Sequence, residues 1–523
     1  MESVDKSSNL QAASTRRSTD TSSPLELRFA FWLPWVVFTV IAYKCSRPLV
    51  SKISWMMFVQ DDFFYYLRTA QNFAHSGHST FGGVVHTNGY HPLWFLALSA
   101  LSVFTVSPGI IMAFLAVTAF LASLITYKCS QRLFENAGIR KLTAIALASA
   151  ITIYSLRMFF YGMEVTLAIP LMFSVLWLLE KDDFWMEGWK ESSILGLLIS
   201  LMVLSRLDTS IFAGLLLVFG ILEPGIRKRI RLPNVIGLSI GLAPLAIYFL
   251  MNHHFFGVWL PISGLAKQLK TNLHPTAETW EGLYLNQLPF LIVFLPIPLG
   301  ILLYPFIAKR IPAIDRIAYP AGILFPLVYF FVLCCKSDWF IWPWYMYAQR
   351  PAVCLAFVVF CTFPSVAGFL AKPFVTASLF AGVLIMLAAA QWKIQEAAIY
   401  EQAIMIQRFS LAHPGVYAMG DRAGRVGYLL NQPLIQTEGL VMDKTFLGYI
   451  QRQTSLREVL DRYHVRYYVG TFNEPDKDCY IEDEPFQAGP EFPRMRGRFC
   501  NPTADFESPG ERSLIFALSG SRQ

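Results

Sequence analysis

The chain has 523 residues, of which 54% are hydrophobic and only 15% are charged. This composition excludes an ordinary soluble domain and predicts a polytopic membrane protein, with the lipid bilayer as its surroundings. The formal net charge of +7 comes mainly from lysines and arginines in loops. In a membrane protein such residues indicate topology, so they do not predict a nucleic-acid partner.

Apolar segments long enough to cross a bilayer recur up to residue 391 and then stop. Residues 1–26 precede them and lack the apolar core of a signal peptide, so we expect a disordered cytoplasmic tail. A short apolar segment, 92–106, is better suited to a re-entrant or interfacial helix than to a crossing. Eleven segments are predicted to span the membrane: 27–43, 109–127, 142–160, 165–179, 193–204, 209–222, 234–251, 287–306, 318–333, 352–370 and 374–391.

Basic residues orient these spans. If 92–106 does not cross, the basic loop clusters, including Arg227 to Arg231, fall on the same side as the N-terminus. The N-terminus is then cytoplasmic. The first large loop, 44–108, and everything after residue 391 lie on the opposite side.

The residue pattern after position 391 differs from that of the membrane domain, 27–391, because the long apolar segments end there. Apolar residues at a helical period over 392–412 predict an amphipathic interfacial helix. Beyond it, the strand patterns "GVYAM", "QPLIQT", "RYYVGT" and "SLIFALS" and the helical patterns "GRVGYLL" and "SLREVLDRY" predict a small α/β domain over 413–523.

Cys479 and Cys500 are the only cysteines in this hydrophilic tail. An oxidising compartment favours a disulfide between them, whereas two unpaired thiols are the alternative. The segment that separates them has little apolar periodicity with which to hold itself in place.

The first loop also carries a pair of adjacent carboxylates, Asp61 and Asp62. Ionisable residues at membrane depth are costly unless they are paired or hydrated, so several on one side predict a functional cavity. The pair could equally begin a helix, because a carboxylate there satisfies free backbone amides. The other candidates on this side are Glu164, Arg206, His86, His91, Lys267, Lys336, Tyr345 and Arg350.

The sequence resembles the bacterial GT-C glycosyltransferases, in the branch of the polyprenyl-phosphoarabinose-dependent arabinofuranosyltransferases and glycosyltransferase 39-like proteins. The pieces that carry the resemblance occur in the family's order: "DDFFYYLRTAQNFAHSG", "TNGYHPLW", "YGMEVTLAIPL", "LSRLDTSIFA", "FFGVWLPISGLAKQ", "AMGDRAGRVGYLLNQPLIQTEGLVMD" and "LREVLDRYHVRYYV". It implies a GT-C fold in a bacterial inner membrane, with a periplasmic first loop and C-terminal domain. It also implies sugar transfer from a polyprenyl-phosphate donor to an envelope glycan, lipid or protein.

The resemblance implies that Asp61 is the catalytic base, with Asp62 beside it. A carboxylate can take the proton of an acceptor hydroxyl as that hydroxyl attacks, and a single base predicts an inverting reaction. The departing lipid phosphate needs cations, for which Lys267 is the first candidate, followed by Arg350, with Arg206 and Lys336 also on this side.

The sequence leaves the roles of the remaining candidate residues open. His86, His91 and Glu164 could hydrogen-bond a sugar. The aromatic run "WFIWPWYMY", which contains Tyr345, is typical of an interfacial belt, and stacking on a sugar is the alternative. The carboxylates could hold magnesium, manganese or calcium, although no diagnostic spacing supports such a site. The competing functions are a lipid-linked sugar flippase or transporter and a non-catalytic scaffold.

Overall fold

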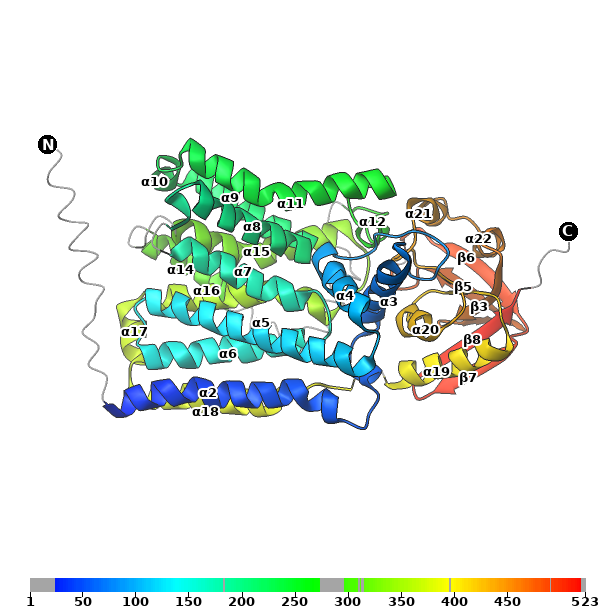
Figure 1. Cartoon of the computed structure of the whole chain (residues 1–523), viewed down its shortest axis with the longest axis horizontal. Helices are drawn as coiled ribbons and strands as arrows, with labels where there is room; N and C mark the ends of the chain where they lie inside the picture. Colours follow the sequence, from blue (N-terminus) through cyan, green and yellow to red (C-terminus); the bar gives the residue numbers. More distant parts are fainter. Residues whose placement is uncertain are drawn as a thin grey trace.

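The computed structural model describes residues 24–181, 184–272, 296–308, 311, 315–394, 397–489 and 491–518. Long helices lie side by side in a bundle, and a small α/β unit is attached to one end of that bundle (Figure 1). We call this end of the bundle the proximal end and the opposite end the distal end. The chain enters the bundle at the distal end, where α2 begins.

Each of the predicted spans overlaps helices of the bundle; residues 287–295 and the tail residues 1–23 lie outside the described residues. Among the described residues, four helices are suited by length and hydropathy to crossing a membrane, namely α5, α6, α11 and α15. A fifth span arises if η5–α16 and α17, bent by 103°, count as one. The bundle helices are α2 (Pro24–Ser46), α5 (Pro108–Asn136), α6 (Lys141–Phe159), α7 (Val165–Glu180), α8 (Trp189–Ser205), α9 (Ser210–Leu222), α11 (Leu232–Phe256), α14 (Pro296–Ile307), α15 (Asp315–Lys336), α16 (Gln349–Cys361), α17 (Pro364–Leu370) and α18 (Pro373–Ala389).

Glycines allow the closest helix pair of the bundle, α8 and α11, to approach. A Cβ atom added at Gly241 would lie 2.3 Å from the carbonyl oxygen of Ser193, and one at Gly237 would lie 2.1 Å from that of Trp189. Small residues that bring two backbones together are typical of helix packing in membranes.

The short helices gather mainly at the ends of the bundle. α3 (Asp61–Ser76) and α4 (Pro92–Phe104) pack on each other at the proximal end (Figure 1). The second of these is the segment predicted to be re-entrant or interfacial. The remaining short elements are η1 (Arg47–Val50), η2 (Trp55–Phe58), η3 (Phe184–Met186), η4 (Leu207–Thr209), α10 (Pro224–Arg227), α12 (Ile262–Ala266) and η5 (Pro343–Ala348).

The basic loops that set the predicted topology lie at the distal end. This end carries α10 and α17, and with them Arg227 and Lys372 (Figure 1). Arg316 ties the start of α15 to the end of α9 there, with two hydrogen bonds of 2.9 Å to Glu223. The structure thus separates the basic loops from the α/β unit by the length of the bundle, as the charge distribution predicts.

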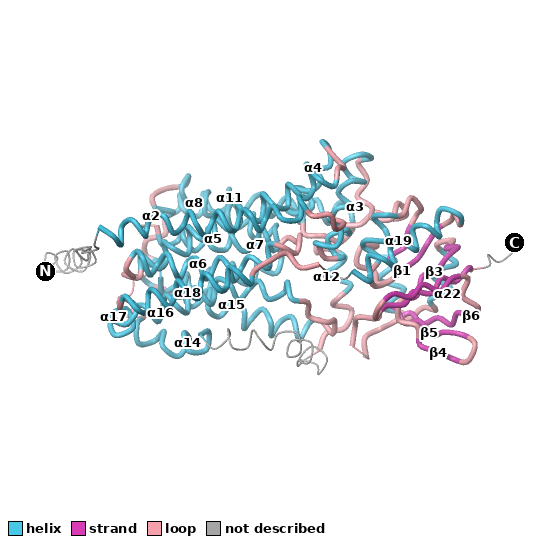
Figure 2. Tube along the Cα trace, turned by 90° about the horizontal axis from the view of Figure 1, so that it is seen from below, coloured by secondary structure: helices cyan, strands magenta, loops and turns pink. Residues whose placement is uncertain are grey.

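The α/β unit contains a mixed five-stranded sheet in the order β2-β1-β3-β8-β7, in which β1 runs parallel to β2 and β3. A second sheet, β4-β5-β6, is antiparallel, and Figure 2 shows all the strands gathered at this end of the molecule. The strands are β1 (Val416–Met419), β2 (Leu434–Gln436), β3 (Val465–Gly470), β4 (Glu474–Asp476), β5 (Cys479–Glu484), β6 (Met495–Cys500), β7 (Ala504–Ser508) and β8 (Glu511–Ala517).

The predicted strands and helices of this unit are confirmed as β1, β2, β3, β8, α20 (Ala423–Leu429) and α22 (Leu456–Arg462). The sequence did not predict α21 (Lys444–Gln451) or the strands β4 to β7. The predicted disulfide between Cys479 and Cys500 is present and joins directly opposed residues of β5 and β6.

The helix α19 (Ala397–Ala412) corresponds to the predicted interfacial helix. Its Ala403 and Ile406 are fully buried in one core with Tyr417 and Ile515 of the sheet. Because the sheet covers this apolar face, we assign α19 to the α/β unit.

Candidate active site

A cavity of about 400 Å³ lies where the proximal end of the bundle meets the α/β unit. Residues far apart in the sequence line it, from α3 near the start of the chain to Leu440 and Val441 in the α/β unit. The structure brings most of the predicted site residues together here: Asp62, His91, Glu164, Arg206, Lys267, Lys336 and Tyr345.

Arg206 is the most heavily contacted charge in this cavity. Its Nη1 donates to Glu164 Oε1, and its Nε lies 3.1 Å from both carboxylate oxygens of Asp208. Its guanidinium stacks over the rings of Tyr345 and Tyr347, at 4.9 and 4.7 Å. Pairing on several sides is what a cation that is only 3% exposed requires.

Asp208 and Tyr347 complete this arrangement, and the sequence did not single them out as site residues. Tyr347 donates a hydrogen bond of 2.6 Å to Asp208 Oδ1. Asp208 stands two positions after Arg206 in "SRLDTS", so the signal for it was present. The part played by Tyr347 depends on the fold of η5, which no local pattern shows.

His91 is held in one tautomer. Its Nδ1 lies 3.3 Å from the backbone N–H of Leu207, which can only donate, so the imidazole proton is on Nε2. That nitrogen lies 3.9 Å from Glu164 Oε1. Burial lowers the pKa of His91 more than Glu164 raises it, so His91 is a neutral hydrogen-bond donor at neutral pH.

Lys267 is a partly buried cation at the edge of the same cavity. Its Nζ donates a hydrogen bond of 2.9 Å to the Tyr345 hydroxyl and lies over the ring of Trp339 at 5.3 Å. Burial alone would lower the pKa of Lys267, but Tyr345 and Asp62 together outweigh it and raise that pKa. The lysine therefore remains charged.

A smaller pocket of about 190 Å³ adjoins the cavity and shares Asp62, Tyr65, Lys267, Trp344 and Leu440 with it. The smaller pocket has a different lining, because the α/β unit supplies Asp421, Arg422, Glu438, Gln487 and Glu511. Trp342 and Trp344 line it as a stacked pair, with centroids 5.4 Å apart and planes within 1°. Asp62 thus borders both spaces.

Asp61 lines the smaller pocket together with Asp62, but its carboxylate is engaged by the α/β unit. Its Oδ2 accepts from the Gly424 amide at 2.8 Å and its Oδ1 from the Arg425 amide at 2.9 Å, at the start of α20. The buried Arg425 side chain adds a contact of 3.4 Å to Oδ1 and donates to Val59 O at 2.8 Å. Asp61 therefore fastens the α/β unit to the start of α3.

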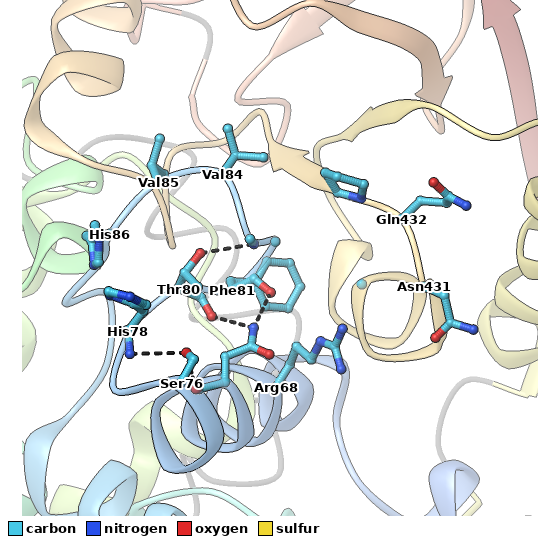
Figure 3. Close-up of a pocket in the computed structure, with 15 residues that line it drawn as sticks. Arg68, Ser76, His78, Thr80, Phe81, Val84, Val85, His86, Asn431 and Gln432 are labelled. Carbon is cyan, nitrogen blue, oxygen red and sulfur yellow. Dashed lines mark hydrogen bonds between the residues drawn. The ribbon is translucent and has the colours of Figure 1, made fainter.

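Two predicted residues lie away from the cavity. Arg350 is buried on α16, where its guanidinium stacks over Tyr154 at 4.1 Å and donates to Met346 O. His86 lines a separate groove together with His78 (Figure 3). Neither residue lines the cavity that holds Asp62.

The tryptophans of the aromatic run point into protein. Trp339 and Trp344 are each 5% exposed, and both line the smaller pocket. This position differs from the lipid-facing belt that is typical of such runs and leaves them available to a ligand of that pocket.

Two carboxylates of the cavity are already paired and are not free to bind a divalent cation. Glu164 and Asp208 are both engaged by Arg206. Within the described ranges, no group of three or more His, Cys, Asp or Glu side chains is arranged to hold a metal ion. We derive no chemical step through a metal.

Comparison with known proteins gives similarity at the level of fold. No protein-family model and no curated protein matches the chain. Among solved structures, ArnT from Cupriavidus metallidurans bound to undecaprenyl phosphate aligns with a TM-score of 0.54 and 13% identity, over 94% of this chain and 99% of that chain.

The Archaeoglobus fulgidus oligosaccharyltransferase is also similar. Its apo form aligns with a TM-score of 0.53 and 12% identity, over 84% of this chain and 70% of that chain. The same enzyme tethered to an acceptor peptide with an NVT sequon gives a TM-score of 0.53 and 14% identity, over 85% and 69%. The chain therefore has the GT-C membrane fold, which confirms the fold predicted from the sequence.

Proposed function

We propose that this protein is an inverting glycosyltransferase that moves a sugar from a polyprenyl-phosphate donor to a hydroxyl of a cell-envelope glycan, lipid or protein. The reaction takes place on the outer face of a bacterial inner membrane. The observation that carries the proposal is the position of Asp62 between two pockets of different chemistry. The solved ArnT structure with undecaprenyl phosphate, which shares the fold, supports a lipid-phosphate donor.

The larger cavity suits the donor. Lys267, Arg206 and Lys336 supply cations, while Val332 and Leu333 of α15 supply apolar wall on the bundle side. A prenyl chain can lie along such a helix while its phosphate reaches the cations. Fixed positive charge around the phosphate stabilises it as it departs with the electron pair of the broken bond to the sugar.

The smaller pocket suits the acceptor. The stacked faces of Trp342 and Trp344 provide a flat apolar surface, and Gln487 and Asp421 provide hydrogen-bonding groups. Aromatic rings beside a few polar groups are typical of sites that bind hydroxyl-rich ligands in a fixed orientation.

Asp62 is the base in this proposal. Both carboxylate oxygens of Asp61 already accept backbone amide hydrogen bonds, so this carboxylate is engaged within the fold. Asp62 takes the acceptor proton as the acceptor oxygen attacks the anomeric carbon from the face opposite the phosphate, so the anomeric configuration inverts. Asp61 is a positioning residue that holds the two halves of the site together.

Transport is the competing function that the sequence leaves open. Transporters bind their substrate near the membrane midplane, often between repeated halves. The cavity here lies instead at one end of the bundle, where α3, the ends of α9 and α15, the proximal loops and the α/β unit line it. This position favours an enzyme.

The experiment begins with mass spectrometry of envelope glycans, lipids and glycoproteins from cells with and without the protein. We expect one sugar modification to be lost in its absence. Complementation with Asp62→Asn should fail, because removing a general base slows transfer by about a hundredfold or more. The exposed Asp461→Asn on α22 is the matched control. An unchanged envelope, or full complementation by Asp62→Asn, would contradict the proposal.

A further inference from the structure

A groove of about 480 Å³ lies apart from the active site, between the bundle and the α/β unit. It shares no lining residue with the cavity or the pocket beside Asp62. One stripe of α3 forms its floor, the loop 77–91 between α3 and α4 forms one wall, and the turn from α20 to β2 forms the other (Figure 3).

The groove is lined by basic and uncharged residues only. None of its fifteen lining residues is acidic, whereas Asp62, Glu164 and Asp208 line the active-site cavity. Arg68 lies at the side of the groove where Asn431 is found, and His78 and His86 lie at the other side (Figure 3). Such a lining attracts an anion and offers it several hydrogen-bond donors.

Arg68 differs from the other arginines near the active site. Its Nε is buried and has no hydrogen-bond partner, and no salt bridge joins its guanidinium to an acid in the described part of the chain. Arg206 and Arg425, by contrast, each contact a carboxylate. Burial lowers the pKa of Arg68, and only Tyr428 raises it. A half-buried cation with no acid paired to it is suited to an external anion.

The walls of the groove are fixed in place before any ligand binds. Asn72 Nδ2 donates to Thr80 O at 2.7 Å and to Phe81 O at 3.1 Å, which ties the loop to α3. The Leu434 amide donates to Gly82 O at 3.1 Å, which ties the same loop to β2. A Cβ atom at Gly82 would lie 1.8 Å from Leu434 O, so this approach requires glycine. A site whose walls are already in place loses little entropy on binding.

The groove is also adjacent to the acceptor side of the active site. Phe81 of the groove packs against Tyr65, with ring centroids 5.0 Å apart, and Tyr65 lines both pockets at Asp62. One aromatic pair therefore connects the lining of the groove with the lining of both pockets at Asp62.

We propose that this groove binds an oxyanion, a phosphate or a carboxylate group, carried by the acceptor. Arg68 supplies the charge, and the side-chain amides of Asn431 and Gln432 hydrogen-bond the anion and neighbouring hydroxyls. The assignment of the anion to the acceptor rests on the proposed function, whereas the binding of the anion does not. The same phosphate chemistry could belong to a glycan or to a lipid headgroup.

Equilibrium binding to the purified full-length protein tests the site without turnover. We expect glucose 6-phosphate and glucuronate to bind, and glucose to bind much more weakly. Arg68→Gln should weaken binding of both anions at least about tenfold, because it removes a charge-assisted contact. Arg462→Gln, at an exposed arginine of α22, is the matched control and should leave binding unchanged.

A second variant tests the site independently, in case Arg68→Gln does not fold. Asn431→Asp keeps the side-chain shape but adds a negative charge, so it should also weaken anion binding at least about tenfold. Tighter Arg68-dependent binding of glucose 6-phosphate than of dispersed phosphatidic acid supports a glycan acceptor, and the reverse order supports a lipid acceptor. Absence of anion binding, or equal binding by wild type and Arg68→Gln, overturns the proposal whatever the outcome for Asp62.

Discussion

Asp61 and Asp62 are neighbours in the chain, yet their surroundings differ, and on that difference we propose different roles for them. The sequence places both carboxylates at the site, because they follow the first span and precede the motifs of a glycosyltransferase. The resemblance gave the role of base to Asp61, and our proposal gives it to Asp62. The sequence could not show the reason, since the amides that hold Asp61 come from residues 363 and 364 positions later in the chain. The same limit applies to Tyr347, which reaches Asp208 across 139 positions.

The contact between Asp61 and α20 leaves no room for a side chain at Gly424. A Cβ atom there would lie 2.2 Å from Asp61 O and 2.5 Å from its Oδ2. We expect Gly424→Ala to destabilise the folded protein by about 1 to 3 kcal/mol through overpacking and to reduce sugar transfer. Thermal unfolding of the purified protein measures the first effect. Gly214→Ala, where a Cβ atom meets open space, is the control; equal unfolding temperatures for the two variants would rule out the tight contact.

Lys267 offers a test of the donor side. Its charge lies beside Asp62 and Tyr345, where the departing phosphate would gain negative charge. Lys267→Gln should lower the transfer rate at saturating donor by roughly tenfold to a thousandfold, because it removes a fixed cation from the transition state. Steady-state kinetics measure the effect, with the exposed Lys444→Gln as control. A Lys267→Gln enzyme with a normal rate would place the phosphate elsewhere.

Among the elements, the hairpin of β5 and β6 was only partly predicted from the sequence. Two cysteines in a hydrophilic tail were enough to predict the disulfide. The strands themselves were not predicted, because inward positions hold residues that are not apolar, namely Glu482 and Glu484 in β5 and Gly497 in β6. For α19, the sequence predicted the helix and its apolar face. It could not predict whether lipid or protein covers that face.

Two buried glutamates of β5 should make the free energy of unfolding depend on pH. Burial and mutual repulsion raise the pKa of Glu482 to about 8, and burial raises the pKa of Glu484 to about 7. Both carboxyls are thus protonated in the folded state at pH values where an unfolded glutamate, with a pKa of about 4.3, is ionised. Their contribution to stability is complete below that value and is lost as pH rises through 7 and 8.

We therefore expect the α/β unit to unfold several degrees lower at pH 8.5 than at pH 6. Thermal unfolding followed by tryptophan fluorescence across this range measures the change. Glu482→Gln should flatten the dependence, whereas the exposed Glu507→Gln should keep it. The same unfolding temperature at both pH values would show that these carboxyls are ionised in the fold.

At the scale of the whole molecule, the bundle places basic loops and the α/β unit at opposite ends. Charge counting predicted this separation because it depends on the number of crossings and not on any tertiary contact. In intact spheroplasts, we expect Glu507→Cys to react with a membrane-impermeant thiol reagent and Arg229→Cys to be protected. Labelling after lysis is the control for reactivity at both positions. The opposite pattern would move the active site to the cytoplasmic face.

The hydrogen bond between Gly82 and Leu434 has a consequence for biosynthesis. The ribosome makes the second residue about 350 residues after the first, which takes about 20 to 70 s at ordinary rates of bacterial translation. During that time the loop 77–91 is already made, while the chain that will complete the groove does not yet exist. Under the proposed function, a nascent or truncated chain therefore cannot transfer a sugar, and activity begins only after the last strands have been made and have packed against this loop.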